Sequence, residues 1–161
     1  MSEYLATIKW RRDDQPFTDH RYSRGHFWEF DGGITVPASA SPHVVPLPMS
    51  IESNVDPEEA FVAAISNCHM LFFLSMAVKN AYVIDSYTDK AIGTMEKDAN
   101  GKMSMTKVVL HPEVVFQSKQ PSLVELEGMH YLVAKWPVQS YWWESTLLIL
   151  ALYPEKSFMT L

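Results

Sequence analysis

The sequence has little cysteine: Cys68 is the only one among 161 residues. A single cysteine excludes an intramolecular disulfide, and with it the class of secreted domains that depend on such bridges. The first residues also lack the basic and then apolar layout of a secretory signal peptide. We therefore expect a cytoplasmic protein. The length suits one domain with its own core, so we assign residues 1–161 to a single domain.

Positive charge is also scarce. The formal net charge is −6, and basic residues gather only in the stretch KWRR at 9–12, which Asp13 and Asp14 follow directly. Proteins that bind nucleic acids need a basic surface to neutralise phosphates. The sequence therefore excludes this class of partner, and the small basic cluster predicts a solvated strand end.

The chain lacks a long apolar run without polar interruption. Its most apolar segment, 61–78, contains Ser66, Asn67 and His69. This pattern favours a buried helix of a soluble protein over a membrane span, so we expect no membrane association.

Helix start signals precede this apolar segment. Asp56 is a good N-cap, Pro57 suits the first helical position, and Glu59 completes a capping box. Apolar residues recur at helical spacing on one face, and the opposite face is also apolar; the first set is Phe61, Ala64 or Ile65, Cys68, Phe72 and Met76. A helix that is apolar on all sides must be covered on all sides, so we expect a homodimer packed around these helices.

The segments before this helix predict strands. Residues 4–10 alternate between apolar and polar, and residues 26–30 form a second strand that the turn signal at 31–33 ends. The segment 37–48 holds four prolines, which excludes a helix or a central strand and favours a loop or edge segment.

The segments after the helix predict a hairpin, a second helix and a last strand. Two β-rich stretches, 82–97 and 102–116, flank the hairpin signal Asn100-Gly101. Pro121 and a capping box of Ser122 and Glu125 begin a helix that Pro137 stops, and residues 138–153 resemble a final strand. The order predicts an α+β fold with largely antiparallel strands.

Cys68 can be a small core side chain or a nucleophile. Cysteine is among the most commonly buried residue types, and spacing alone favours inert packing. Reaction with a peroxide requires the thiolate, which a nearby cation stabilises. Cys68 lies too deep in its helix for that helix's own dipole to supply this stabilisation, so a cation must come from elsewhere in the chain.

The stretch VDPEEAFVAAISNCHMLFFLSMAVKN, with YSRGHFWEFDGG before it and MTKVVLHPEVVF after it, resembles the OsmC and organic hydroperoxide resistance family. The resemblance spans roughly residues 4–133. It implies an OsmC-like fold, in which largely antiparallel sheets wrap around long central helices of an intertwined homodimer. It also implies reduction of organic hydroperoxides or hydrogen peroxide, without a cofactor or metal, by a cysteine that an arginine and a glutamate assist.

Residue by residue, the resemblance places the reactive thiol at Cys68 and the glutamate at Glu58. The arginine is Arg24 in YSRGHF, with Arg21 as the second choice. Ten helical residues separate Glu58 from Cys68 by ~15 Å, which is too far for one guanidinium to contact both. Either the helix breaks near 63–64 or the glutamate comes from the partner subunit.

The chain departs from the family pattern at the second, resolving cysteine. Trp136-Pro137 stands where related sequences carry it. A disulfide within one chain is therefore impossible, and three alternatives remain: an external thiol reductant resolves Cys68, two Cys68 thiols pair between subunits, or the redox cycle has been lost. We favour the external thiol as the partner.

Three other functions compete with a peroxidase. A Cys-His hydrolase would use His69 or His130 as its base, but no nucleophile–base spacing supports it. A metal site drawn from Cys68, His69, His43 or His26 has no recognised ligand spacing. The strongest rival is a non-catalytic homodimer that binds an apolar ligand between aromatic side chains, with candidates at Trp28, Phe72, Phe73, Trp142 and Trp143.

Overall fold

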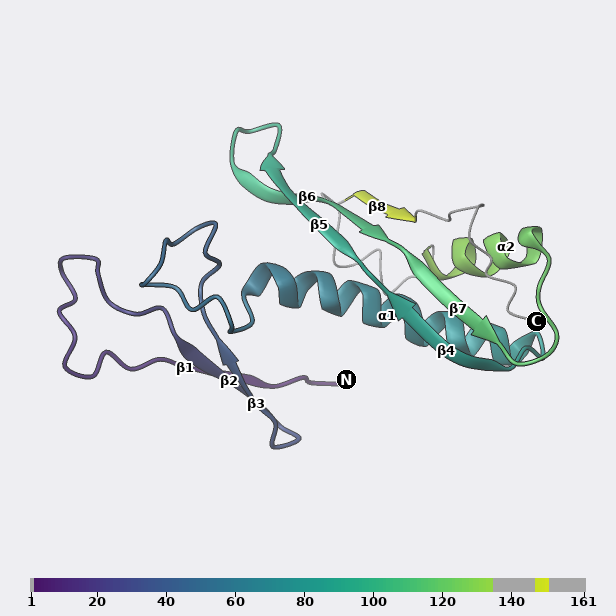
Figure 1. The fold of residues 1–161 in the computed structure, drawn as a ribbon, viewed down its shortest axis with the longest axis horizontal. Helices are drawn as coiled ribbons and strands as arrows, with labels where there is room; N and C mark the ends of the chain where they lie inside the picture. Colours follow the sequence, from purple (N-terminus) through teal and green to yellow (C-terminus); the bar gives the residue numbers. More distant parts are fainter. Residues whose placement is uncertain (1, 135–146, 151–161) are drawn as a thin grey trace. The chain divides into compact units, whose positions relative to one another are not determined.

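The computed structural model describes residues 2–134 and 147–150, and the chain divides into two compact units, Met1–Phe61 and Val62–Leu161. Among these described residues, the N-terminal unit holds three strands, and the C-terminal unit holds five strands and a second helix (Figure 1). The long helix α1 begins in the first unit and continues through the second. The α+β class is confirmed, and assignment of the chain to a single domain stays a prediction.

The N-terminal unit contains an antiparallel sheet of β1 (Ala6–Lys9), β2 (His26–Phe30) and β3 (Thr35–Ala38), in that order. The bounds of β2 are those that the sequence predicts. The sequence analysis did not assign β3 as a strand, because Pro37 lies inside it. β3 is an outer strand of this sheet, where the missing proline N–H is tolerated. Only residues 37–38 of the proline-rich segment 37–48 belong to this edge strand, and the rest of the segment is loop, as the sequence predicts.

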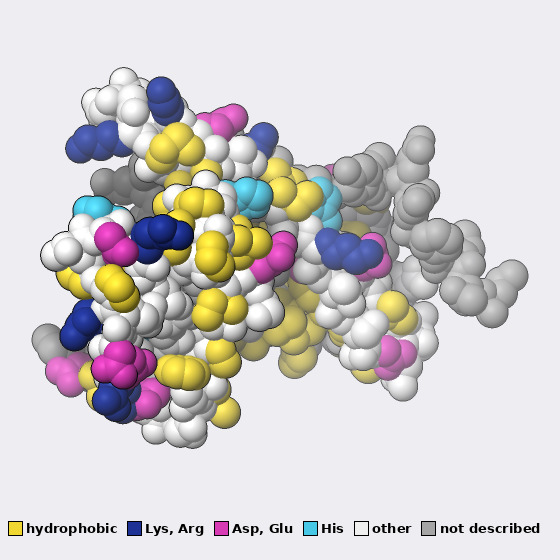
Figure 2. Space-filling view, turned by 60° about the vertical axis from the view of Figure 1, so that its left-hand side comes forward, with side chains coloured by type: hydrophobic (Ala, Val, Ile, Leu, Met, Phe, Trp, Pro, Cys, Tyr) yellow, Lys and Arg dark blue, Asp and Glu magenta, His cyan; other side chains and the backbone are white. Residues whose placement is uncertain are grey.

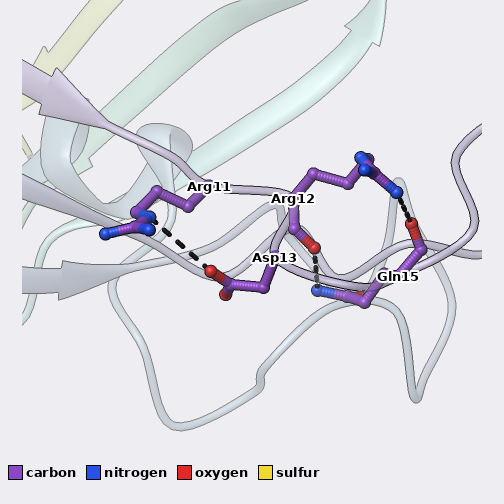
Figure 3. Close-up of polar contacts among 4 residues, drawn as sticks. All are labelled: Arg11, Arg12, Asp13 and Gln15. Carbon is purple, nitrogen blue, oxygen red and sulfur yellow. Dashed lines mark hydrogen bonds and ion pairs between the residues drawn. The ribbon is translucent and has the colours of Figure 1, made fainter.

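The basic cluster at the end of β1 is solvated, as predicted. Lys9 pairs with Glu29 across the sheet at 2.6 Å, and Arg11 Nε lies 3.6 Å from Asp13 Oδ1 with both side chains mostly exposed. The chain turns directly afterwards: Arg12 Nη1 donates to the Gln15 carbonyl and Gln15 Nε2 donates back to the Arg12 carbonyl (Figure 3). These cations therefore hold a turn and an exposed strand end.

Helix α1 (Pro57–Lys79) begins with the predicted capping box. The Glu59 N–H donates to Asp56 Oδ1 at 2.8 Å, and the Asp56 N–H donates to Glu59 Oε2 at 3.2 Å. Two backbone donors that the first turn leaves without helical partners are thus satisfied. Helix α2 (Leu123–Ala134) begins with the second predicted box, in which Ser122 and Glu125 bond reciprocally.

The two β-rich stretches of the C-terminal unit each divide into two strands. β4 (Ile84–Asp89) pairs with β7 (Pro112–Phe116), and β5 (Ile92–Lys97) pairs with β6 (Met103–Leu110), both antiparallel. A short gap separates β4 from β5 and β6 from β7, and a hydrogen bond spans it: the His111 N–H donates to Asp89 Oδ1 at 2.7 Å. Ser66 of α1 donates to the other oxygen of the same carboxylate, which ties the helix to this gap.

The last described strand, β8 (Leu147–Leu150), lies within the predicted final strand 138–153. It pairs with β6 in parallel, so the sheets are largely rather than wholly antiparallel. The rest of the predicted strand, the predicted helix stop at Pro137, and the candidate aromatics Trp142 and Trp143 lie outside the described residues.

Helix α1 lies along β4 and β7, with α2 nearby (Figure 1). The α1 residues buried in the chain recur every four positions: Ile65, His69, Phe73 and Ala77. The predicted face, with Cys68, Phe72 and Met76, lies one step around the helix and is half-buried; Phe72 and Met76 pack against the core. Periodicity could not select the face because α1 is apolar on every side.

By length and composition, α1 would also pass as a membrane span among the described residues. The core helix of a soluble protein can have the same length and apolar composition.

We expect Asp56→Ala to lower the free energy of unfolding by about 1 kcal/mol, because it removes the acceptor that caps α1. Asp56 is buried, whereas Glu52 in the preceding loop is exposed. Urea unfolding at one fixed protein concentration measures the effect, with Glu52→Ala as the control. Equal midpoints for the two variants would contradict the capping role.

Candidate functional site

Cys68 lies in the middle of α1, as a free and half-buried thiol. Its side chain belongs to the stripe beside the buried one, and Phe72, one turn later, packs against the core cluster. Within residues 62–134, the thiol makes no hydrogen bond. Cys68 is therefore partly accessible and its thiol has no hydrogen-bond partner among these residues. A reactive thiol requires such access.

Glu58 lies in the first turn of the same helix and is half-buried. Since α1 runs unbroken from Pro57 to Lys79, the predicted break near 63–64 is excluded. Glu58 and Cys68 of one chain are therefore ~15 Å apart along the helix axis. Of the two alternatives, only the glutamate of a partner subunit remains compatible with one guanidinium contacting both groups.

Arg24 precedes β2 and is half-buried in the N-terminal unit. Its Nη1 donates to the carbonyls of His20 and Tyr22, and its guanidinium carbon lies 3.6 Å from the centre of the Tyr22 ring. Arg21, the second choice, is exposed, and its backbone N–H donates to Asp19. Arg24 is thus the more ordered of the two by its contacts, which supports it over Arg21 as a positioned cation.

The three predicted site residues belong to different units: Arg24 and Glu58 to the first, Cys68 to the second. Their assembly into one charged set stays a prediction.

The structure reveals a buried hydrogen-bond network that the sequence analysis missed. His69 Nδ1 lies 3.0 Å from Tyr87 Oη, and His69 Nε2 lies 3.3 Å from His130 Nδ1. Both histidines are almost fully buried, and Phe73 stacks on His130 with ring centres 4.3 Å apart. A neutral imidazole has one donor and one acceptor, so both nitrogens of His69 are satisfied.

Burial keeps this pair neutral. Desolvation lowers the pKa of His69 to about 4, against the opposing charge of Asp89. Desolvation, and then proximity to His69, lowers the pKa of His130 to about 3. Both nitrogens of His69 are engaged in the core, so it cannot serve Cys68 as the base of a hydrolase.

No group of three or more histidine, cysteine or acidic side chains is placed to bind a metal in the part of the chain that the structure describes. The four metal candidates from the sequence therefore form no such site there. His26 instead bonds to Trp28 and to the Arg24 carbonyl.

One signal could have indicated the buried histidine. His69 lies four residues from both Ile65 and Phe73 in an apolar run, which places it on the face that these two define. Its partners could not be found this way, because Tyr87 and His130 follow 18 and 61 residues later, on other elements.

Solved structures similar to this chain include a near relative and more distant ones. An OsmC-like protein of unknown function from Vibrio cholerae is 52% identical with a TM-score of 0.90, over 95% of this chain and 100% of that one. An organic hydroperoxide resistance protein OsmC from Legionella pneumophila is 12% identical (TM-score 0.66; 93% and 96% covered). The organic hydroperoxide resistance protein OhrB of Bacillus subtilis is 13% identical (TM-score 0.64; 94% and 98% covered).

The last two structures show a shared fold alone. No family model matches the sequence, and no curated protein matches it.

The buried histidine pair predicts loss of stability in mild acid. Unfolded histidines titrate near pH 6.5, whereas His69 and His130 in the folded chain stay neutral down to about pH 4 and 3. Between these values the unfolded chain binds more protons, so the free energy of unfolding falls as pH falls. From pH 7 to pH 5 we expect a loss of about 2 kcal/mol per histidine.

Denaturant unfolding at pH 7 and pH 5, at one protein concentration, measures this loss. In His130→Phe, the loss in free energy of unfolding between pH 7 and pH 5 should be about half that of the unsubstituted protein. Each protein is compared with its own free energy of unfolding at pH 7. His43→Phe, at an exposed position, should leave this loss unchanged. An unchanged loss in His130→Phe would contradict the assignment.

Proposed function

Because this chain belongs to the OsmC-like family, we propose that it is a thiol-dependent peroxidase that reduces organic hydroperoxides through Cys68. The observation that supports this most directly is the place of Cys68: a free, half-buried thiol in the middle of the long helix, ten residues after Glu58. Two solved proteins of the same fold, from Legionella pneumophila and Bacillus subtilis, are organic hydroperoxide resistance proteins, which points to a redox or peroxide-resistance role.

In the first step, the Cys68 thiolate attacks one oxygen of the peroxide bond. A sulfur–oxygen bond forms, the oxygen–oxygen bond breaks, and the sulfur loses two electrons. The other oxygen leaves as an alkoxide and takes up a proton to become the alcohol. The guanidinium of Arg24 would stabilise both the thiolate and this leaving oxygen, since it stays charged throughout.

In the second step, an external thiol attacks the sulfenic acid. Water leaves and a mixed disulfide forms, which a second external thiol reopens to return Cys68 and release the oxidised reductant. The sequence has no other cysteine, so the reductant must come from another molecule. We place this cycle in the cytoplasm, where thiol reductants are abundant.

The proposed enzyme is a homodimer. Helix α1 exposes apolar side chains in the single chain, including Leu71 at 53% and Val78 at 75% exposure. Figure 2 shows further apolar side chains at the surface. A second chain would cover such surface and would bring a second Glu58, which supports the proposal that the carboxylate acts across the interface to hold Arg24.

The apolar side chains around Cys68 on α1 favour bulky organic hydroperoxides over hydrogen peroxide. The rival is the same homodimer as a non-catalytic carrier of an apolar ligand, in which Cys68 would be inert packing.

We expect cumene hydroperoxide to oxidise Cys68 rapidly, and faster than hydrogen peroxide does. Arg24→Ala should slow the oxidation about 100-fold, because it removes the cation that stabilises the leaving oxygen. Thiol loss over time, with mass spectrometry of the trapped sulfenic acid, measures the rate.

The control is Arg11→Ala. It removes an arginine that follows β1 and whose side chain is 88% exposed. It should react like the unsubstituted protein. A Cys68 thiol that survives for hours in excess peroxide would favour the carrier and exclude the peroxidase.

A further inference from the structure

The backbone of Arg24 is fixed on both sides. Its N–H donates to the Met49 carbonyl at 2.7 Å, and its carbonyl lies 2.8 Å from His26 Nδ1. His26 Nε2 in turn lies 2.8 Å from Trp28 Nε1. Indole nitrogen only donates, so His26 Nε2 must accept and the imidazole proton must sit on Nδ1. Trp28 thus sets the tautomer with which His26 donates to the Arg24 carbonyl.

The side chain of Arg24 is held by a second set of contacts. Its guanidinium lies over the ring of Tyr22, a cation–π geometry. The Tyr22 ring is itself packed: Phe17 stacks on it with centres 4.5 Å apart, and Trp10 meets it edge-on at 5.4 Å. The platform under the guanidinium is therefore an aromatic cluster rather than a single mobile ring.

Hydrogen bonds hold this cluster to the chain. Trp10 Nε1 donates to the Ser23 carbonyl at 2.9 Å, and the Ser23 N–H donates to Gln15 Oε1 at 2.7 Å. Gln15 is bonded reciprocally to Arg12 in the turn of Figure 3. The loop between β1 and β2 is thus organised around Tyr22 and Ser23, the two residues directly before Arg24.

Only part of the guanidinium is used by these contacts. Nη1 donates to the carbonyls of His20 and Tyr22, and within residues 2–61 Nε and Nη2 make no hydrogen bond. A guanidinium has five N–H donors, so three stay available for a thiolate, a carboxylate or a peroxide oxygen. A fixed arginine also loses less side-chain entropy when it engages such a group.

We infer that Tyr22 and His26 are positioning residues for Arg24: the Tyr22 ring orients the guanidinium, and the His26 Nδ1–H fixes the backbone that carries it. The inference rests on the proposed function, since it assigns these two residues to the reaction that Arg24 assists. Neither touches the reacting atoms, so each acts through Arg24 alone.

Two pairs of variants of the full-length protein test it. Tyr22→Leu removes the ring, whereas Tyr22→Phe keeps the ring and loses only the hydroxyl. His26→Leu removes the Nδ1–H donor, whereas His26→Asn places an amide N–H at a similar distance along the side chain. We expect the leucine variants to slow Cys68 oxidation by cumene hydroperoxide about tenfold, and the conservative variants to react like the unsubstituted protein.

A second readout separates positioning from general damage to the fold. The rate of Cys68 alkylation by iodoacetamide as a function of pH reports the thiolate. The leucine variants should shift this profile to higher pH, in the same direction as Arg24→Ala, while their conservative partners leave it in place.

The possible failures are distinguishable. Leucine variants as fast as the unsubstituted protein, with Arg24→Ala slow, would overturn the inference and leave the proposed function intact. Tyr22→Phe as slow as Tyr22→Leu would overturn the role of the ring. Arg24→Ala without effect on Cys68 would remove the role of Arg24 and this inference with it.

Discussion

The unbroken course of α1 constrains every account of this protein. A continuous helix fixes Glu58 and Cys68 ~15 Å apart in one chain, so no single guanidinium can contact both. The same helix is apolar on all sides, yet the chain itself buries mainly the stripe of Ile65, His69, Phe73 and Ala77. Both facts are accounted for by a second chain, which would cover the remaining apolar surface and supply the missing carboxylate.

Local chemistry made much of the fold predictable. Both helix starts follow from capping boxes, and the turn signal after Phe30 gave the end of β2 correctly. The stripe that α1 buries within one chain, Ile65, His69, Phe73 and Ala77, could not be selected from the sequence, because a helix that is apolar all round offers no periodic signal to choose a side. β3 was missed since Pro37 is compatible with a strand only at a sheet edge, and edge position is a property of the whole sheet.

The candidate site was less predictable from the sequence than the fold. Cys68 and Glu58 follow from a resemblance, and nothing in their spacing could distinguish a nucleophile from core packing. The contacts of Arg24 with Tyr22 and His26 join neighbours in sequence, but they depend on how the loop 10–25 folds back, which no local rule determines. The hydrogen-bond network of His69, Tyr87 and His130 joins three separate elements, so it could be seen only in the folded structure.

The central claim is that one active site takes its thiol and its carboxylate from different chains. Glu58→Ala and Cys68→Ser should each be inactive alone with cumene hydroperoxide and dithiothreitol. Unfolded and refolded together in equal amounts, they form mixed dimers with one complete site each, so turnover should recover to about a quarter of the unsubstituted rate. A mixture no more active than the average of its two components would contradict the claim.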